Sequence, residues 1–440
     1  MSETAYLPRN LTSQILNWLE RPEVIAIKGP RRAGKTTLLK IIRQELINRG
    51  TNPDTITTLN FEDRSLMGRF ETNPVEFVRS YVSSEAVSKH YLFLDEYQYV
   101  REGGQKLKLI YDTHVPKLKL IITGSSSLEL TSEVGKFMVG RMLSAYLFPF
   151  TFDEFLQARD ERLRRVFEEK NQLLQRFLFD AVPIEEVKKE DIFLQEFAPH
   201  WGEYTAFGGY PAVVTEPQKE LKQTLLNNLS NTYIERDIIS LLGEESITEF
   251  RYLTRLLAIQ TGQLLNYQQL ANDTSLYYRK VKHFLSVLQE TFLIKQLLPL
   301  HGNLSTELRR NPKIYFLDSG LRNSLVNNFA EVDDRTDKGA LVESVALANV
   351  LYNLRPNAEI LYWRTSGGAE VDFIVREGAK LFPIEVKYRT MTQPTVSRSL
   401  CSFIKAYKPQ NVLVLTRDFW GKRTTNNTSI LFAPVWYFGG

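Results

Sequence analysis

Cysteine, clustered histidine and long apolar runs are all scarce in this sequence, and each scarcity excludes a kind of protein. The single cysteine, Cys401, rules out internal disulfides and any zinc site built from cysteines. The five histidines are scattered, without the spacing of metal ligands. There is no N-terminal signal peptide and no run of about eighteen apolar residues. We therefore expect a soluble, cytoplasmic protein with no membrane partner.

Apolar and aromatic residues, at 43% and 12% of the sequence, are plentiful enough to bury sizeable cores. A chain of 440 residues is too long for one ordinary core, so we expect about two to four domains. The net charge of +4 is a mild excess that permits nucleic-acid binding without arguing for it.

One stretch, from Gly29 to Thr36, has the complete pattern of a phosphate-binding loop, G-x-x-x-x-G-K-[ST]. Its glycines let the backbone bend, so that N–H groups and the N-terminus of the next helix point at a polyphosphate. An apolar run at 23–28 and apolar residues at helical spacing over 37–46 supply the strand and helix that this loop requires. We predict that ATP binds here, with Lys35 bridging the β- and γ-phosphates and Thr36 ligating Mg²⁺. The predicted nucleotide-binding residues are Gly29, Pro30, Arg31, Arg32, Ala33, Gly34, Lys35, Thr36 and Thr37.

An acidic signature follows this loop. Residues 55–61 read as a second strand, and the apolar third strand at 90–94 runs directly into Asp95 and Glu96. Alone, an Asp-Glu pair after a strand is more often an ordinary exit to a loop, but after a complete phosphate loop it indicates a nucleotide site. We assign Asp95 to Mg²⁺ and Glu96 to the catalytic base that polarises the attacking water.

Two more catalytic candidates follow the next strand. Ser125 comes after a fourth strand at 117–123, and we expect it to orient the water beside the γ-phosphate; a serine-rich helix cap is the alternative. Arg141 precedes a fifth strand at 142–150. An arginine there would stabilise transition-state charge in the same or a neighbouring subunit, unless it is simply a solvated surface residue.

Further short motifs run along the chain. They are 94–98, 123–126, 140–141, 148–155, 207–211, 233–237, 312–320 and 370–372. With the phosphate loop, they resemble the prokaryotic AAA-type ATPases that carry an uncharacterised C-terminal domain, over nearly the whole chain. The resemblance implies an α/β fold: an ASCE-type P-loop parallel sheet of strand order 5-1-4-3-2, a helical lid, a winged-helix-like module and a C-terminal α/β restriction-endonuclease-like domain.

The segment after the fifth strand, 153–245, is helical and highly charged, and it lies where AAA-type proteins place a lid that closes on nucleotide. Its most charged run, 162–170, is most simply a solvated helix face. Arg236 is either a nucleotide sensor or the partner of Glu235 or Asp237 in an ion pair.

The next segment, 246–330, has the pattern of a winged helix. Helices at 250–259, 266–271 and 276–290, with a turn at 272–275, predict a helix-turn-helix, and 292–317 fits a β-wing. The last helix carries tyrosines among cations, which suits insertion into a DNA groove. These residues are Tyr277, Tyr278, Arg279, Lys280, Lys282 and His283. A protein-interaction or lid module is the alternative, because the fold alone does not fix function.

The last hundred residues hold a second chemical cluster. Glu385 and Lys387 are two apart on a predicted strand at 380–387, so their side chains share a face, and Asp372 lies on the preceding strand. With Glu343, from a helix over 339–354, they look like the PD-(D/E)XK nuclease core. In that core Glu343, Asp372 and Glu385 would bind a divalent metal and Lys387 would position water. The alternative is an exposed ion pair on a domain that cleaves nothing.

The sequence therefore predicts an Mg²⁺-dependent ATPase coupled to a nuclease-like domain that acts on or binds DNA. The predicted divisions are 1–152 for the ATPase core, 153–245 for the lid, 246–330 for the winged-helix-like module and 331–440 for the nuclease-like domain. Two alternatives are a nucleotide-switched interaction protein with an inactive nuclease-like domain, and a ring-forming homo-oligomer in which Arg141 acts in trans.

Overall fold

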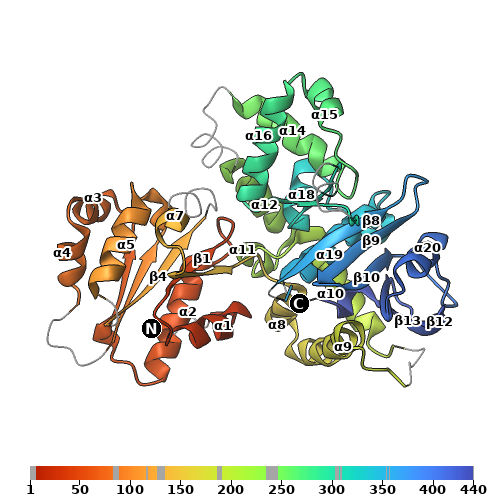
Figure 1. The fold of residues 1–440 in the computed structure, drawn as a ribbon, viewed down its shortest axis with the longest axis horizontal. Helices are drawn as coiled ribbons and strands as arrows, with labels where there is room; N and C mark the ends of the chain where they lie inside the picture. The colour runs from red at the N-terminus through yellow and green to blue at the C-terminus, as the bar shows by residue number, and fades with distance from the viewer. Residues whose placement is uncertain are drawn as a thin grey trace. The chain divides into compact units, whose positions relative to one another are not determined.

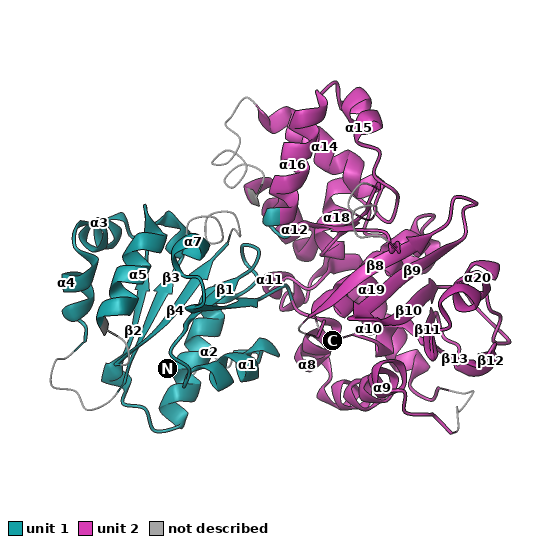
Figure 2. Ribbon diagram, viewed as in Figure 1, with its two compact units in different colours: residues 1–149, 290–292 teal, residues 150–289, 293–440 magenta. Residues whose placement is uncertain are grey.

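The computed structural model describes residues 6–82, 89–114, 117–125, 134–185, 191–233, 246–302, 307, 310–352, 354–355 and 357–439. The chain divides into two compact units (Figure 2). Unit 1 comprises Met1–Pro149 with Glu290–Phe292, and unit 2 comprises Phe150–Gln289 with Leu293–Gly440. The finer division of residues 153–440 into three domains stays a prediction.

Unit 1 is built on a five-stranded sheet of order β2-β3-β4-β1-β5, in which every neighbouring pair is parallel (Figure 1). This confirms the predicted order. The strands are β1 (Val24–Lys28), β2 (Ile56–Asn60), β3 (His90–Asp95), β4 (Leu118–Gly124) and β5 (Met142–Tyr146). The helices are α1 (Leu11–Trp18), α2 (Lys35–Asn48), α3 (Arg64–Thr72), α4 (Pro74–Arg79), α5 (Gly103–His114) and the short α7 (Gly135–Phe137), with 3₁₀ turns η1 (Pro53–Thr55) and η2 (Tyr97–Tyr99).

Helices cover both faces of this sheet, which explains why β1, β3 and β4 are buried along their whole length. Ile25 and Ile27 of β1 face a core shared with α1 and α2, whereas Val24 and Ala26 face a core shared with α3, α4 and α5. Successive residues of one strand thus enter opposite cores. The carboxyl ends of the strands, where ligands bind in open α/β sheets, lie together at one edge.

Unit 2 begins with helices that surround its core. They are α8 (Phe152–Arg159), α9 (Glu161–Asp180), α10 (Leu194–Phe207), α11 (Pro211–Val214), α12 (Lys219–Tyr233), α14 (Ile247–Ile259), α15 (Tyr267–Thr274) and α16 (Tyr278–Glu290). The antiparallel pair β6 (Ile294–Leu297) and β7 (Lys313–Phe316) follows, then α18 (Ser319–Val326), η6 (Val332–Asp334) and α19 (Lys338–Tyr352). Side chains from α10, α12, α14, α16 and α18 share one hydrophobic core.

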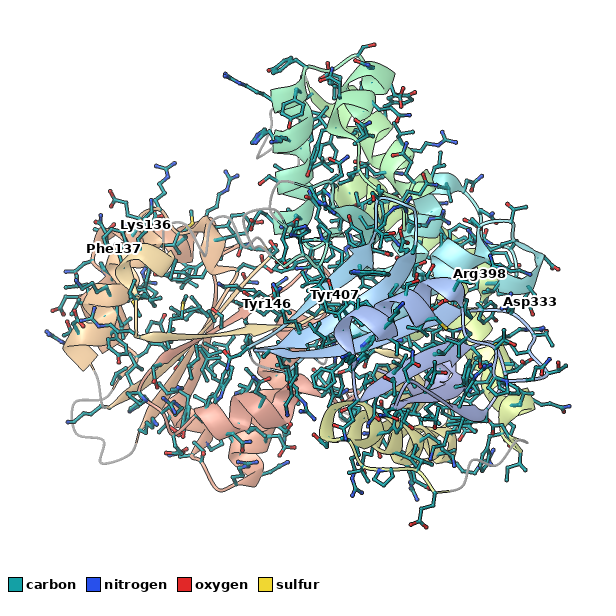
Figure 3. The ribbon with its side chains drawn as sticks, turned by 45° about the vertical axis from the view of Figure 1, so that its right-hand side comes forward. Lys136, Phe137, Tyr146, Asp333, Arg398 and Tyr407 are labelled. Atoms are coloured by element: carbon teal, nitrogen blue, oxygen red, sulfur yellow. The ribbon has the colours of Figure 1, made fainter. Side chains whose placement is uncertain are left out.

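A six-stranded mixed sheet of order β12-β13-β11-β10-β9-β8 completes unit 2. Its strands are β8 (Ala358–Arg364), β9 (Glu370–Glu377), β10 (Lys380–Lys387), β11 (Asn411–Thr416), β12 (Gly421–Thr425) and β13 (Thr428–Pro434), followed by η7 (Val435–Tyr437). Helix α20 (Arg398–Tyr407), whose ends Arg398 and Tyr407 are labelled in Figure 3, packs Phe403 against Trp363 of β8.

The helices after the ATPase core pack directly on this second sheet. Phe197 of α10 stacks on Trp436, with ring centroids 6.4 Å apart. Asn411, at the start of β11, donates a hydrogen bond to the carbonyl oxygen of Phe177 in α9. Gly439 donates from its backbone N–H to Asn171 of α9, at 3.2 Å. Segments far apart in the sequence thus form one body.

Three close approaches in unit 2 require glycine. A Cβ at Gly208, whose φ is +72°, would lie 2.3 Å from a carboxylate oxygen of Asp318, and one at Gly320 would lie 2.0 Å from the carbonyl oxygen of Phe207. One at Gly209 would lie 2.1 Å from the carbonyl oxygen of Phe150. The buried Asp318 carboxylate accepts hydrogen bonds from the N–H groups of Gly209 and Leu321, both at 2.8 Å. We call this junction, formed by Gly208, Gly209, Asp318 and Gly320, the glycine clasp.

The helix-turn-helix differs in detail from its prediction. Residues 272–274, expected in the turn, continue α15, and α16 begins two residues later than expected. The helix stops at Ser275, whose left-handed φ of +56° ends the α15 hydrogen-bond pattern. Residues 303–306 and 308–309 of the predicted wing, and Arg236, lie outside the described residues. No helix within the described ranges has both the length and the apolar character needed to cross a membrane.

Candidate nucleotide site and nuclease-like cluster

The phosphate-binding loop connects β1 to α2, as its pattern predicts. Gly29 packs closely on the residue that follows β5, so an added Cβ would lie 1.9 Å from the carbonyl oxygen of Leu147. Gly34 adopts φ +98° and caps the N-terminus of α2. Arg32 is also left-handed, at φ +60°. The loop therefore packs closely at Gly29, turns at Arg32 and Gly34, and leads into a helix N-terminus, the ordinary setting for phosphate binding.

Lys35 begins α2 and is buried beneath the loop. Its ammonium donates to the carbonyl oxygens of Gly29, at 3.1 Å, and Pro30, at 3.0 Å. The loop is held from outside by Arg9, whose guanidinium donates to the carbonyl oxygens of Ala33, at 2.8 Å, and Phe148, at 2.6 Å. Arg9 was not predicted, because it lies far from the motif in sequence and has no pattern of its own.

The two predicted magnesium ligands of this site touch each other. The Thr36 hydroxyl donates to a carboxylate oxygen of Asp95 at 2.6 Å, and Asp95 is buried at the end of β3. The other oxygen of Asp95 accepts a hydrogen bond from Thr123 of β4. A hydroxyl next to a carboxylate, both hard oxygen donors, fits Mg²⁺. Thr123 was also not predicted to have a role, although it is the first residue of the 123–126 motif, because the strand-tip role was assigned to Ser125.

Glu96 and Ser125 are joined by a glutamine. Glu96 has a left-handed φ of +56°, and its backbone N–H donates to the hydroxyl of Thr123 at 3.0 Å. The amide nitrogen of Gln98 donates both to the Glu96 carboxylate and to the Ser125 hydroxyl, the latter at 3.1 Å. Gln98 belongs to the 94–98 motif and lies two residues after Glu96. This position could have indicated that it contacts the Glu96 carboxylate.

Arg141 lies away from these residues. Its carbonyl oxygen accepts from the N–H of Val24, the first residue of β1, whereas the phosphate loop follows the last residue of that strand. Five strand residues separate the two edges by roughly 13 Å. The Arg141 guanidinium lies 3.5 Å from the carboxylate of Asp112 and above the ring of Tyr111. Arg141 is thus at the opposite edge of the sheet from the loop of its own subunit.

In unit 2 the structure brings together the four residues of the nuclease-like cluster, which are Glu343, Asp372, Glu385 and Lys387. Strands β9 and β10 pair antiparallel, and a carboxylate oxygen of Asp372 accepts from the N–H of Val386 at 2.7 Å. The Lys387 ammonium lies 2.7 Å from a Glu385 oxygen. Burial raises the pKa values of Asp372 and Glu385, and burial followed by the charge of Asp372 raises the pKa of Glu343 to about 7. Burial of these three carboxyl groups therefore opposes their ionisation.

A second lysine, which was not predicted, enters the cluster from β7. The ammonium of Lys313 lies 2.5 Å from Glu370 and 3.2 Å from Glu343. The Tyr315 hydroxyl donates to the same oxygen of Glu343. Burial opposes the charge of Lys313, but the surrounding carboxylates outweigh it and raise its pKa. The sequence placed Lys313 in a wing strand, and only the tertiary fold carries it to Glu343.

Protein groups already occupy part of the carboxylate oxygens in this cluster. Each predicted ligand already accepts from a protein group: Glu343 from Lys313 and Tyr315, Asp372 from the Val386 N–H, and Glu385 from Lys387 and Ser397. Over the described ranges, no group of three or more histidine, cysteine, aspartate or glutamate side chains is placed to hold a metal ion. Metal binding by Glu343, Asp372 and Glu385 stays a prediction.

Helix α16 presents a mixed set of side chains. Tyr277, the residue before the helix, is 68% exposed, and Arg279 and His283 on the helix are also exposed. Lys280 forms an ion pair with Glu249 of α14, and Lys282 lies 4.8 Å from the ring centroid of Tyr278. Two of the three cations on this helix are therefore already in contact with neighbouring side chains.

The fold and the nucleotide site define the class of unit 1. Residues 21–156 match the family model described as "AAA domain". Unit 1 contains an AAA-type P-loop ATPase domain, a nucleotide-binding module. Residues 198–332 match a domain of unknown function, DUF8612, and residues 338–434 match a second one, DUF4143.

Two similar proteins match most of the chain. An uncharacterised protein of Haemophilus influenzae is 23% identical over 99% of this chain and 99% of its own length. An uncharacterised protein of Mycobacterium tuberculosis is 25% identical over 90% of this chain and 76% of its own. Among solved structures, the Aeropyrum pernix ORC2 protein in its ADP form is similar over 67% of this chain and 90% of its own, with 14% identity and a TM-score of 0.34. C. elegans PCH-2 is similar over 63% and 69%, with 16% identity and a TM-score of 0.27.

Proposed function

We propose that this protein hydrolyses Mg-ATP in unit 1 and uses the nucleotide state to control DNA binding by unit 2, without cleaving the DNA. The contact between the Thr36 hydroxyl and the Asp95 carboxylate, at 2.6 Å, is the observation that carries the ATPase proposal. It puts the two expected magnesium ligands side by side at the loop edge, next to Glu96.

In this proposal Lys35 and the N-terminus of α2 bind the phosphates, and Thr36 and Asp95 hold Mg²⁺, which when bound neutralises phosphate charge. Glu96 polarises the attacking water. Gln98 keeps the Glu96 carboxylate and the Ser125 hydroxyl together, and Ser125 orients the water. Arg141 lies at the other edge of the sheet, so a catalytic role for it requires the nucleotide site of a neighbouring subunit.

The DNA proposal rests on α16. Tyr277, just before α16, and Arg279, in its first turn, are both exposed after the turn of the helix-turn-helix, where cations and tyrosines suit DNA contacts. Two lysines, Lys313 and Lys387, already lie against Glu343 and Glu385 and supply positive charge to the cluster, which supports a domain that binds DNA without cutting it. The other candidate function is a nucleotide-switched protein-interaction module, which the same exposed helix would also serve. A cytoplasmic location and homo-oligomer formation stay predictions.

Substitutions in the nucleotide site test the first half of the proposal. We expect Lys35→Ala to lose ATP binding, because the ammonium that pairs with the phosphates is gone. We expect Glu96→Gln to bind ATP normally and to hydrolyse it on the order of 100-fold more slowly, because the amide cannot act as a base. Equilibrium binding of a fluorescent ATP analogue and steady-state phosphate release measure the two effects.

The control is Glu76→Gln, which removes a carboxylate exposed on α4 and should leave both measurements unchanged. Normal turnover in Glu96→Gln would remove the base assignment. Stimulation of hydrolysis by DNA supports the coupling, whereas a slow rate that no DNA changes favours the interaction module. Nucleotide-dependent oligomers that disappear in Arg141→Ala would instead favour a ring.

A further inference from the structure

Lys313 is a buried cation that starts in the predicted winged-helix-like module, while its ammonium contacts carboxylates of the predicted nuclease-like domain. Its side chain is 4% exposed, and it starts from β7, which pairs only with β6 among the named strands of the described residues. Its ammonium nevertheless lies within 3.2 Å of Glu343 on α19 and 2.5 Å of Glu370 on β9. Aromatic rings of Tyr315 and Tyr362 enclose it, with centroids 6.0 and 5.9 Å away. An ammonium in this enclosure needs its carboxylate partners.

The carboxylates of the cluster also need this ammonium. Four of them gather here, Glu343, Glu370, Asp372 and Glu385, and the nearby cations are Lys313, Lys387 and Arg364. Arg364 binds the other oxygen of Glu370, at 2.6 Å. Lys313 is therefore the cation that Glu343 and Glu370 share. A buried charge left without its partner is strongly destabilising, so removing one member of this network should destabilise the others.

We propose that Lys313 is the built-in counter-ion of the nuclease-like cluster, holding Glu343 and Glu370 and so clamping β7 to α19 and β9 without a metal ion. Tyr315, two residues along the same strand, adds a second hydrogen bond to Glu343. One strand of the winged-helix-like module thereby ties that module to the second sheet. The inference concerns unit 2 alone and depends on neither ATP hydrolysis nor DNA binding.

The proposal is tested first in the full-length chain carrying Lys35→Ala, which weakens the nucleotide site, with no nucleotide present. Mn²⁺ binding is followed by electron paramagnetic resonance, and thermal unfolding is measured in EDTA and in Mn²⁺. We expect no stoichiometric Mn²⁺ binding that depends on the cluster and no difference in Tm. Stoichiometric Mn²⁺ binding that Asp372→Asn abolishes, with a higher Tm in Mn²⁺, would overturn the proposal. This measurement needs no variant of Lys313 to fold.

The second test replaces the lysine itself. Lys313→Met should lower the Tm far more than Lys295→Met, the matched control on β6, because Lys295 makes no ion pair with any described residue. Adding Glu343→Gln and Glu370→Gln to Lys313→Met should recover part of the loss, since the uncompensated charges are then gone. Equal losses in the two lysine variants, without recovery in the combined variant, would refute the clamp. ATP turnover, measured in parallel, tests the proposed function separately.

Discussion

The Gln98 side chain positions both polar groups that were predicted to face the attacking water. Its amide nitrogen is shared between the Glu96 carboxylate and the Ser125 hydroxyl. A glutamate carboxylate with no such donor would sample several rotamers, and the fraction of time spent aligned for catalysis would fall. In the proposed mechanism, Gln98 therefore acts through Glu96 and Ser125 as a positioning residue.

Removing this amide should slow the chemical step without weakening nucleotide binding. We expect Gln98→Ala to lower kcat on the order of ten-fold and to leave KM unchanged, because the nucleotide-binding loop is untouched. Steady-state ATP hydrolysis measures both constants. Gln105→Ala, an exposed glutamine of α5, is the control and should behave as the wild type. A raised KM with normal kcat would show that Gln98 serves binding instead.

At this scale the sequence predicted groups that belong to a contiguous motif and missed those that do not. Lys35, Thr36, Asp95 and Glu96 stand in a loop and at a strand end, where spacing alone indicates their chemistry. Arg9 and Lys313 reach their sites only because the chain folds back on itself. A single basic residue outside any motif does not indicate which residues it will contact, so only the folded structure shows these contacts.

Among the elements, the glycine clasp accounts for two motifs whose role the sequence left open. Residues 207–211 end α10, and residues 312–320 lead into α18; the clasp brings these segments into contact. Only glycines allow the approach, and Asp318 supplies the hydrogen bonds that fix it. Burial raises the pKa of Asp318 to about 6, against the backbone hydrogen bonds that favour its ionised form. The clasp therefore joins α10 to α18 through a carboxyl group that resists ionisation.

This raised pKa predicts how the stability of unit 2 changes with pH. The unfolded chain releases the Asp318 proton near pH 4, whereas the folded chain keeps it until about pH 6. Raising the pH through that window favours the unfolded state, by up to roughly 3 kcal/mol. We expect the wild type to lose stability relative to Asp318→Asn between pH 4 and 6, and the difference to level off above pH 7.

Thermal unfolding of the two proteins across this range gives the comparison. Asp273→Asn, at an exposed position of α15, serves as the control and should run parallel to the wild type. A constant difference between wild type and Asp318→Asn from pH 4 to 7 would mean that Asp318 titrates alike in the folded and unfolded chains.

For the whole molecule, the sequence predicted the first unit better than the second. The strands of the parallel sheet were predicted from local signals, namely apolar runs, a glycine loop and acids at strand ends, and their order was implied by the resemblance to AAA-type ATPases. In unit 2, the mixed sheet is covered by helices from the predicted lid, and the contacts that join them, such as Phe197 with Trp436, link residues that share no pattern. Long-range packing of this kind is set by the folded chain and not by local periodicity.

DNA binding by the full-length chain is the prediction at this scale. We expect nucleotide-dependent binding of duplex DNA without cleavage in Mg²⁺ or Mn²⁺, and roughly three- to ten-fold weaker binding in Arg279→Ala, because one phosphate contact is lost. Fluorescence anisotropy measures the affinity, and gels of linear, circular and single-stranded DNA report cutting. Arg165→Ala, at an exposed arginine of α9, is the charge-matched control.

Metal-dependent cutting that Asp372→Ala abolishes would establish a nuclease and contradict the proposal that unit 2 only binds. Equal affinities for the wild type, Arg279→Ala and Arg165→Ala would direct attention from α16 to a protein partner. Binding that Lys35→Ala leaves insensitive to ATP, together with ATP-sensitive binding by the wild type, would show that unit 1 controls unit 2.

The contact between Asn171 and Gly439 also has a consequence for how the protein is made. These two residues are 268 positions apart. At the pace of a ribosome, α9 is synthesised roughly half a minute before its partner residues exist. The strands of unit 1 are complete by residue 146, so that unit can fold early. The side chains of α9 and α10 that pack on the last strands, such as Phe197 on Trp436, stay uncovered during that interval, and a chaperone could protect them.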